Sequence, residues 1–259
     1  MSEQIEAVIF DLDDTLIDWA QPTVTWEEFT RPRVESVRRY LARNGHELPP
    51  AERFFELVQQ AVQDTWTEAK KHWMIPSMGE MLMDLLAEMG LDTGDLDRDE
   101  LLRVYNWEPL PGVVVFEDTI PVLEELRRRG YKIGLVTNSF LPIWMRDAEL
   151  RAYELIDYLD ARVSSGDVGY LKPHPAIYRH MLDELAAEPE RTIFVGDRPV
   201  NDIAGANEVG LISILMDPPH LTRELDGVQP DYTISRLREL LPILEALEHS
   251  ARSPQQDPQ

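Results

Sequence analysis

Residues 7–15 read AVIFDLDDT, an apolar run that ends abruptly in a cluster of acidic residues. Four consecutive apolar residues, Ala7–Phe10, are typical of a short strand that is buried on both faces of a parallel sheet. Ligands of such sheets bind at the carboxyl ends of the strands. We therefore expect Asp11 and Asp13 at a functional site, while we interpret Asp14 as a structural or solvated residue.

The rest of the chain falls into two parts with different patterns. Apolar residues recur at helical spacing through residues 22–107 without a convincing strand between them. From residue 109 onward apolar strands alternate with helices, which indicates right-handed crossovers and a parallel sheet. We predict an α/β core domain from residues 1–17 and 109–249, an all-α domain from 18–108, and a disordered tail from 250–259. Helices are expected at 22–44, 49–73, 76–89, 97–107, 119–129, 141–150, 175–187, 202–209 and 235–247, and strands at 7–10, 131–136, 161–164, 192–195 and 211–216.

The composition excludes several classes of function. None of the 259 residues is cysteine, which rules out disulfides, a thiol nucleophile, cysteine-ligated zinc and cysteine-ligated iron–sulfur clusters. The net charge of −23 would repel nucleic acid and anionic membranes. We find no signal peptide and no apolar run of membrane-spanning length. The expectation is a soluble, cytoplasmic protein, monomer or homodimer, whose partner is a small molecule.

Polar residues recur where the later strands end. One strand ends in Thr137 and Asn138, a later loop carries Lys172, and a further strand ends before Asp197, with Asp202 five residues on. Together with the first strand, they would place several carboxylates, one hydroxyl with free backbone amides, and one fixed cation at a single edge of the sheet.

Phosphoryl transfer requires this set of groups, because its catalysis consists largely of positioning and electrostatic stabilisation. Asp11 and Asp197 could supply oxygen ligands to Mg²⁺. Asp11 could also attack phosphorus and form an aspartyl phosphate, while Asp13 could protonate the leaving oxygen and later activate water. Thr137 and nearby backbone amides could hold phosphate oxygens, and Lys172 would offset their charge.

The four segments resemble the motifs of the haloacid dehalogenase superfamily, on its phosphatase branch. The order of the segments and the strands that precede them also match, and residues 18–108 look like the α-helical cap of the family. The resemblance implies a Rossmann-like core. The matches are Asp11, Asp13 and Thr15 for motif one, Thr137 for motif two, Lys172 for motif three, and Gly196-Asp197 with Asn201-Asp202 for motif four.

The resemblance also implies which residues hold the metal and react. Asp11 would be the nucleophile and a metal ligand, and Asp13 the general acid and base, with its backbone carbonyl on the metal. Asp197 would ligate Mg²⁺ directly or through water, and Asp202 would support it. Asp202 could instead be a carboxylate that merely favours a helix start.

The remaining motif residues would bind the substrate. By resemblance, Thr137, Asn138 and Lys172 would hold the transferring phosphoryl group of a small phosphomonoester. The predicted function is that of a Mg²⁺-dependent phosphohydrolase working through an aspartyl phosphate.

Three other functions remain open at this point. A 2-haloacid dehalogenase of the same superfamily needs no proton donor for its halide and no metal, so Asp13 and Asn201-Asp202 argue against it. A phosphomutase would share every core motif. A phosphorylated signalling module also combines an acidic cluster with Thr and Lys, but lacks a long helical insertion.

A few further residues have two interpretations. Arg198 could touch an anionic substrate or form a salt bridge at the rim, and His174 is expected in a loop. The basic segment Lys70-Lys71-His72-Trp73 could lie over the site and contact the leaving group of the substrate. The tryptophans of residues 18–108 are interpreted as core residues rather than a ligand pocket.

Overall fold

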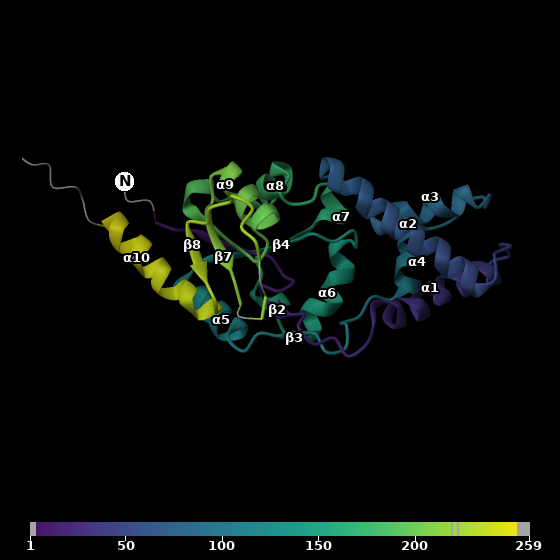
Figure 1. The fold of residues 1–259 in the computed structure, drawn as a ribbon, viewed down its shortest axis with the longest axis horizontal. Coiled ribbons are helices and arrows are strands. Elements are labelled where there is room, and N and C mark those ends of the chain that lie inside the picture. The colour runs from purple at the N-terminus through teal and green to yellow at the C-terminus, as the bar shows by residue number, and fades with distance from the viewer. Residues whose placement is uncertain (1–3, 219, 222, 253–259) are drawn as a thin grey trace, which may run out of the picture.

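A parallel sheet forms the core of the protein (Figure 1). The structure is a computed structural model that describes residues 4–218, 220, 221 and 223–252. Neighbouring strands all pair in parallel, as predicted. Within the described residues this sheet has six strands, in the order β5 (Ala161–Ser164), β4 (Lys132–Thr137), β1 (Ala7–Phe10), β6 (Thr192–Gly196), β7 (Ile212–Met216) and β8 (Tyr232–Ile234).

Helices cover both faces of the sheet, and β1 is buried between them. Successive side chains of a strand point to opposite faces. Ala7 and Ile9 belong to the apolar cluster of α8 (Pro175–Leu185). Val8 and Phe10 belong to the cluster that includes residues of α5 (Thr119–Arg129) and α10 (Leu240–Arg252). This double burial explains why the strand reads as a continuous apolar run.

The helical region, residues 19–113, lies between β1 and α5 and is made mainly of helices. Its helices lie together at the end of the molecule away from the sheet (Figure 1). Two short antiparallel strands, β2 (Ile17–Asp18) and β3 (Val114–Val115), pair where this region leaves and re-enters the core. The division into domains at residues 18 and 108 stays a prediction. The helices are α1 (Trp26–Arg43), α2 (Ala51–His72), α3 (Met78–Glu88) and α4 (Arg98–Tyr105).

The first helix begins four residues later than expected. Thr25 is its N-cap: the Glu28 backbone N–H donates to Thr25 Oγ1 (3.1 Å), and the Thr25 N–H donates to the Glu28 carboxylate (2.8 Å). This capping box, rather than Pro22, sets the start of α1. Within the described residues, no helix is both long and apolar enough to cross a membrane.

Other differences concern short or irregular elements. The helix expected from residue 202 begins as a π-helical turn, Pro199–Ala204, and continues as α9 (Gly205–Val209). Neither β8 nor the β2–β3 pair was expected. Helix α10 runs to Arg252, into the predicted tail, and residues 253–259 of that tail lie outside the described residues. The remaining elements are α6 (Ile143–Ala152), α7 (Ser165–Val168) and the 3₁₀ turns Ile156–Tyr158, Pro189–Arg191 and Leu237–Glu239.

Candidate active site

The carboxyl ends of three neighbouring strands bring predicted site residues together. Asp11 directly follows β1, Thr137 is the last residue of β4, and Asp197 directly follows β6. Because β1 pairs with both β4 and β6, these residues lie at the same edge of the sheet. A pocket of about 50 Å³ lies here, and its lining residues are Asp11, Asp13, Asn138, Lys172, Arg198, Asn201 and Asp202.

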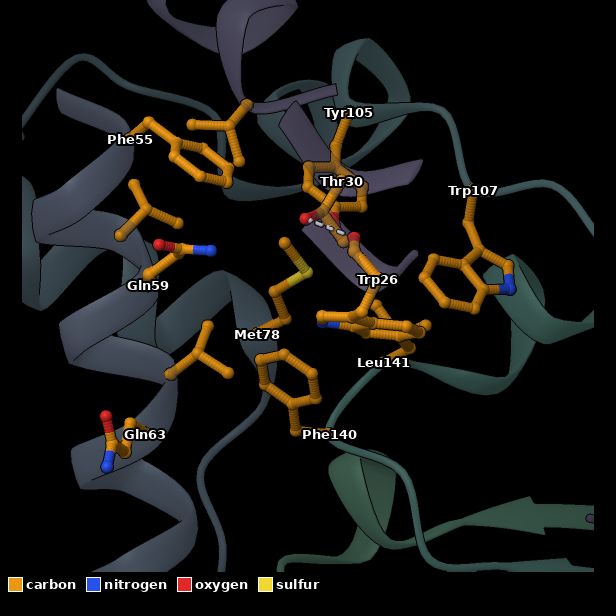
Figure 2. Close-up of a pocket in the computed structure, with 13 residues that line it drawn as sticks. Trp26, Thr30, Phe55, Gln59, Gln63, Met78, Tyr105, Trp107, Phe140 and Leu141 are labelled. Carbon is orange, nitrogen blue, oxygen red and sulfur yellow. Dashed lines mark hydrogen bonds between the residues drawn. The ribbon is translucent and has the colours of Figure 1, made fainter. Parts of the chain in front are cut away.

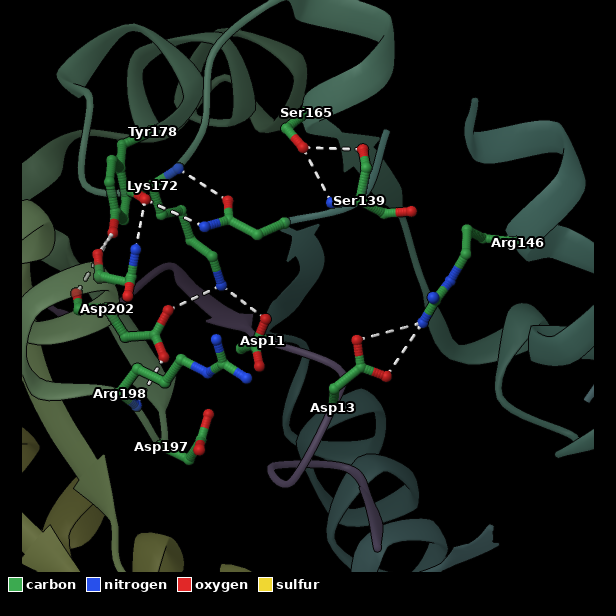
Figure 3. A network of polar contacts seen from close by, with 12 residues as sticks. Asp11, Asp13, Ser139, Arg146, Ser165, Lys172, Tyr178, Asp197, Arg198 and Asp202 are labelled. Atoms are coloured by element: carbon green, nitrogen blue, oxygen red, sulfur yellow. Dashed lines mark hydrogen bonds and ion pairs between the residues drawn. The ribbon is translucent and has the colours of Figure 1, made fainter. Parts of the chain in front are cut away.

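Lys172 is a buried cation between two carboxylates (Figure 3). Its Nζ lies 2.5 Å from Asp11 Oδ1 and 2.7 Å from Asp202 Oδ1. Burial alone would favour the neutral amine, but the two carboxylates hold the pKa of Lys172 above its ordinary value. Lys172 is therefore a permanent positive charge beside Asp11.

Two asparagines fix the backbone of Lys172. The Lys172 N–H donates to Asn138 Oδ1 (2.7 Å), and the Lys172 carbonyl accepts from Asn138 Nδ2 (3.0 Å) and Asn201 Nδ2 (2.6 Å). Both polar atoms of the Asn138 side chain are thus engaged with Lys172. The predicted phosphate contact of Asn138 would therefore come from its backbone amide, while its side chain positions the lysine.

Three buried carboxylates form one cluster. Oxygen atoms of Asp11, Asp197 and Asp202 all lie within 4.8 Å of one another. Burial is the main cause that raises the pKa of Asp11 to about 7, although Lys172 lowers it, and the charge of Asp202 raises it further. Burial, followed by the charges of Asp202 and Asp11, raises the pKa of Asp197 to about 8. Burial and the repulsion between these carboxylates thus both disfavour their ionised forms in the metal-free site.

The cluster fits a divalent metal ion. Asp197 Oδ1 is buried and has no hydrogen-bond partner among the described residues. An orphaned carboxylate oxygen is costly in a protein interior unless a cation binds it. Hard oxygen ligands of this kind are those that Mg²⁺ prefers. Asp11, Asp197 and Asp202 are thus the side chains that could hold the ion.

Arg223 contributes a second positive charge, which the sequence analysis missed. Its Nη2 contacts Asp197 Oδ2 and lies 3.3 Å from Asp14 Oδ2. Asp14 also accepts a hydrogen bond from the Trp19 backbone N–H (3.2 Å), which agrees with its interpretation as a structural residue. Arg223 lies between β7 and β8, 26 residues after Asp197, and no motif marks it.

Asp13 is held by two donors that the sequence analysis did not assign to the site. Trp19 Nε1 donates to Asp13 Oδ1 (2.9 Å), and Arg146 Nη2 donates to Asp13 Oδ1 (3.1 Å) and Oδ2 (3.4 Å; Figure 3). Arg146 is buried, and its Nε lies 2.7 Å from Glu149 Oε2, which is also buried. A single arginine in a helix has no spacing pattern that could have pointed to this contact.

Thr137 has a free hydroxyl at the site. Its side chain is fully buried, and its Oγ1 has no hydrogen-bond partner among the described residues. A buried hydroxyl normally has a partner. The position of Thr137 at the end of β4, beside Asp11, suits a ligand oxygen.

Arg198 and His174 have different surroundings. Arg198 lines the pocket and is exposed, and its guanidinium forms no ion pair within the described part of the chain. Its backbone N–H donates to Asp202 Oδ2 (2.8 Å). His174, expected in a loop, is the N-cap of α8 and stacks on Tyr170 at 4.3 Å between ring centroids. His174 is thus a structural residue.

The basic segment of the helical region does not reach the pocket lining. Lys71 is exposed and pairs with Glu68 (2.5 Å), and neither Lys70 nor Lys71 belongs to the lining residues. The chain just after it does contact the core, because the Ile75 N–H donates to the Gly169 carbonyl (3.0 Å). Their predicted contact with the leaving group stays a prediction.

The helical region contains a larger cavity of its own (Figure 2). It measures about 320 Å³ and has no charged lining residue. Trp107 is buried in its wall, whereas Trp26 is 49% exposed at its edge. Phe140 and Leu141, just beyond Asn138, form the wall toward the core. Trp107 is thus a core residue that also lines the cavity, whereas Trp26 lines the cavity from an exposed position.

The fold and the site together define an α/β protein whose candidate active site is built from carboxylates at the carboxyl edge of its sheet. The sequence profile of the haloacid dehalogenase-like hydrolases matches residues 5–210, and the chain belongs to that family. The resemblance inferred from the four motifs is therefore confirmed, as is the fold class.

Three similar proteins have names that give three different activities. A glyceraldehyde 3-phosphate phosphatase of Methanopyrus kandleri is 27% identical, over 94% of this chain and 98% of the relative. The pyrophosphatase PpaX of Bacillus mycoides is 26% identical, over 94% of this chain and 99% of the relative. A 2-haloacid dehalogenase structure from Pseudomonas syringae pv. Tomato DC3000 has a TM-score of 0.61 and 26% identity, over 94% of this chain and 99% of that chain.

Proposed function

We propose that the protein is a Mg²⁺-dependent phosphatase of small phosphomonoesters that works through an aspartyl phosphate on Asp11. The observation that carries the proposal is the buried cluster of Asp11, Asp197 and Asp202, bridged by Lys172 and facing Asp13. Such a cluster combines a carboxylate nucleophile, a site for a cation and a second carboxylate within reach of a leaving group.

The metal would be held by the side chains of Asp11, Asp197 and Asp202, together with the backbone carbonyl of Asp13. When bound, Mg²⁺ would supply positive charge that stabilises the phosphoryl oxygens. Asp13 would contribute its carbonyl only, so that its carboxylate stays free for proton transfer. The partnerless Asp197 Oδ1 supports this assignment.

In the first chemical step, a carboxylate oxygen of Asp11 forms a bond to phosphorus, and the bond from phosphorus to the ester oxygen breaks. The departing alcohol oxygen takes a proton from Asp13. Lys172 and the Thr137 hydroxyl hold the non-reacting phosphoryl oxygens. Because Lys172 is already fixed beside Asp11, little reorganisation is needed when charge develops on those oxygens.

In the second step, the ionised Asp13 takes a proton from a water molecule, whose oxygen attacks phosphorus. The bond between phosphorus and Asp11 breaks, which releases phosphate and restores both carboxyl groups. Asp13 thus acts first as an acid and then as a base, and the protonation states at the end are those at the start.

The dehalogenase alternative is less well supported. A halide leaves without a proton, so that reaction has no use for Asp13 held close to Asp11. It also has no use for a cation that would neutralise three buried carboxylates. A phosphomutase would use the same residues, and transfer to an acceptor alcohol in place of water would reveal it.

Two of the named relatives support a small phosphorylated metabolite as the substrate, and we propose that the protein acts in the cytoplasm. One of them is a phosphatase of a triose phosphate, and the other a pyrophosphatase. We further propose that residues 18–108 form a cap domain over a core of residues 1–17 and 109–249.

The proposal is tested with purified protein and p-nitrophenyl phosphate, followed by a panel of phosphorylated metabolites. We expect hydrolysis in the presence of Mg²⁺, its loss in EDTA, and its recovery when Mg²⁺ is added back. The variant Asp11→Asn should lose essentially all turnover while keeping its circular dichroism spectrum. Release of halide from 2-haloacids without metal would instead favour the dehalogenase.

A further inference from the structure

Asp13 would be a mobile group if nothing held it. Its side chain is 28% exposed, and it lies in the loop that follows β1 rather than in a strand or helix. A group that transfers a proton must keep its reacting oxygen within hydrogen-bond reach of the leaving oxygen. Whatever orients Asp13 therefore affects the chemical step.

Two donors from separate parts of the chain converge on the same oxygen of Asp13. Trp19, just after β2, donates from Nε1 to Oδ1 (2.9 Å), and Arg146 of α6 donates from Nη2 to Oδ1 (3.1 Å). Oδ2 has a single, longer contact with Arg146 (3.4 Å). A carboxylate oxygen accepts about two hydrogen bonds. Oδ1 is therefore fully occupied, whereas Oδ2 has room for a proton and a further partner.

We propose that Trp19 and Arg146 are positioning residues that hold Asp13 by Oδ1 and leave Oδ2 to exchange the proton with the leaving group and with water. The inference rests on the proposed phosphatase function. Neither residue lines the small pocket itself, and each contacts the pocket residue Asp13, so each acts through Asp13 rather than on the substrate.

Glu149 explains how the buried Arg146 can keep an ion-pair partner when Asp13 gains or loses its proton. Arg146 is 4% exposed and Glu149 is 1% exposed, and they lie three residues apart on α6 with Nε and Oε2 separated by 2.7 Å. If Asp13 were the only counter-ion, its protonation would leave Arg146 buried and unpaired, which is strongly unfavourable. Glu149 stays a counter-ion in both states of Asp13. The acid can thus be protonated without losing its orientation.

This role predicts a dependence on the leaving group. A p-nitrophenolate ion is a stable leaving group and departs with little help from an acid, whereas the alkoxide of a simple alkyl phosphate needs the proton. Loss of the orientation of Asp13 should therefore slow the alkyl ester far more than the aryl ester. A residue that only maintains the fold would slow both substrates alike.

The test compares p-nitrophenyl phosphate with an alkyl phosphate such as glycerol 1-phosphate. Single-turnover measurements with enzyme in excess isolate the first chemical step, and steady-state measurements separate kcat from KM. The variants are Arg146→Met, Arg146→Lys, Trp19→Phe and Glu149→Gln. The matched control is Arg162→Met, which removes another arginine paired with α6, through Asp147 (2.8 Å), but away from Asp13.

We expect Arg146→Met to lose about 100-fold in single-turnover rate on the alkyl ester and about tenfold or less on the aryl ester, with KM nearly unchanged. Arg146→Lys should recover part of the loss. Glu149→Gln should show the same split, a larger loss of rate on the alkyl ester than on the aryl ester, but to a smaller extent. Trp19→Phe keeps the ring and removes the donor, so it tests the same split if Arg146→Met fails to fold. Arg162→Met should show no split.

Two results would overturn the inference while leaving the phosphatase function intact. One is an equal loss on both esters in Arg146→Met and in Trp19→Phe. The other is a change confined to KM, which would make these residues part of substrate binding. Absence of phosphate release from either ester in the unmodified protein would count against the proposed function itself.

Discussion

Replacement of Lys172 by methionine is predicted to destabilise the metal-free protein by about 3–5 kcal/mol at pH 8. The side chain of Lys172 is 2% exposed, and its Nζ contacts Asp11 at 2.5 Å and Asp202 at 2.7 Å. Methionine has a similar volume, so the loss reflects charge rather than a cavity. Removal of one partner from a buried ion pair leaves the other charge without compensation, and this cluster would lose its nearest cation.

Protonation should offset part of that loss at lower pH. The pKa of Asp11 is about 7 with Lys172 in place, and Lys172 lowers it, so the variant should have a still higher value. Asp11 then becomes neutral in the folded variant well above the pH at which it does so in the unfolded chain. The destabilisation should therefore be clearly smaller at pH 6 than at pH 8.

Urea unfolding followed by circular dichroism, in EDTA at both pH values, measures the effect. Lys132→Met is the matched control, because Lys132 Nζ donates to the carbonyls of Leu185 (2.6 Å) and Ala186 (2.8 Å) instead of to carboxylates. It should lose about 1 kcal/mol, independent of pH. The reasoning is refuted if Lys172→Met loses no more than Lys132→Met, or loses as much at pH 6 as at pH 8.

Three further outcomes are expected. In EDTA the unfolding free energy of the unmodified protein should fall by about 2 kcal/mol per pH unit as pH rises from about 5 to 8. The pKa values of Asp11 and Asp197 are about 7 and 8, so the folded state holds up to two protons that the unfolded chain has lost. Mg²⁺ should abolish the slope, and a rising stability would contradict this. Arg223→Met should bind Mg²⁺ about tenfold more tightly in calorimetry, because a cation that contacts Asp197 is gone; weaker binding would mean that Arg223 supports the metal site. Gly196→Ala should lower the free energy of unfolding by about 1–3 kcal/mol, measured by heat or urea. A Cβ atom at this position would collide with the carboxyl group of Asp202, which Lys172 holds in place. Unchanged stability would show that Asp202 can move.

The positions of the motif residues could be predicted because strand topology alone brings them together. A parallel sheet aligns the carboxyl ends of its strands, so Asp11, Thr137 and Asp197 had to meet once their strands were neighbours. Lys172 follows no strand directly, and its inclusion came from the resemblance to a family. The structure adds the reason for its position, which is the pair of asparagines that hold its backbone.

The supporting residues could not be predicted in this way. Arg146 lies 133 residues from Asp13, and its contact depends on where α6 lies relative to the loop that follows β1. Arg223 belongs to an irregular stretch whose path no periodicity describes. Short elements were missed for a related reason: β2 and β8 have two and three residues, too few for a repeating pattern to emerge.

Chemical trapping of the intermediate tests the central claim most directly. The protein is mixed with excess phosphomonoester and Mg²⁺, quenched within one turnover and reduced with borohydride, which converts an aspartyl phosphate to homoserine. Mass spectrometry of the peptide that contains residues 7–15 then locates the modification. We predict homoserine at Asp11 and none at Asp13, dependent on both substrate and Mg²⁺. Rapid phosphate release without any modification of Asp11 would mean that water attacks the ester directly, and would contradict the account.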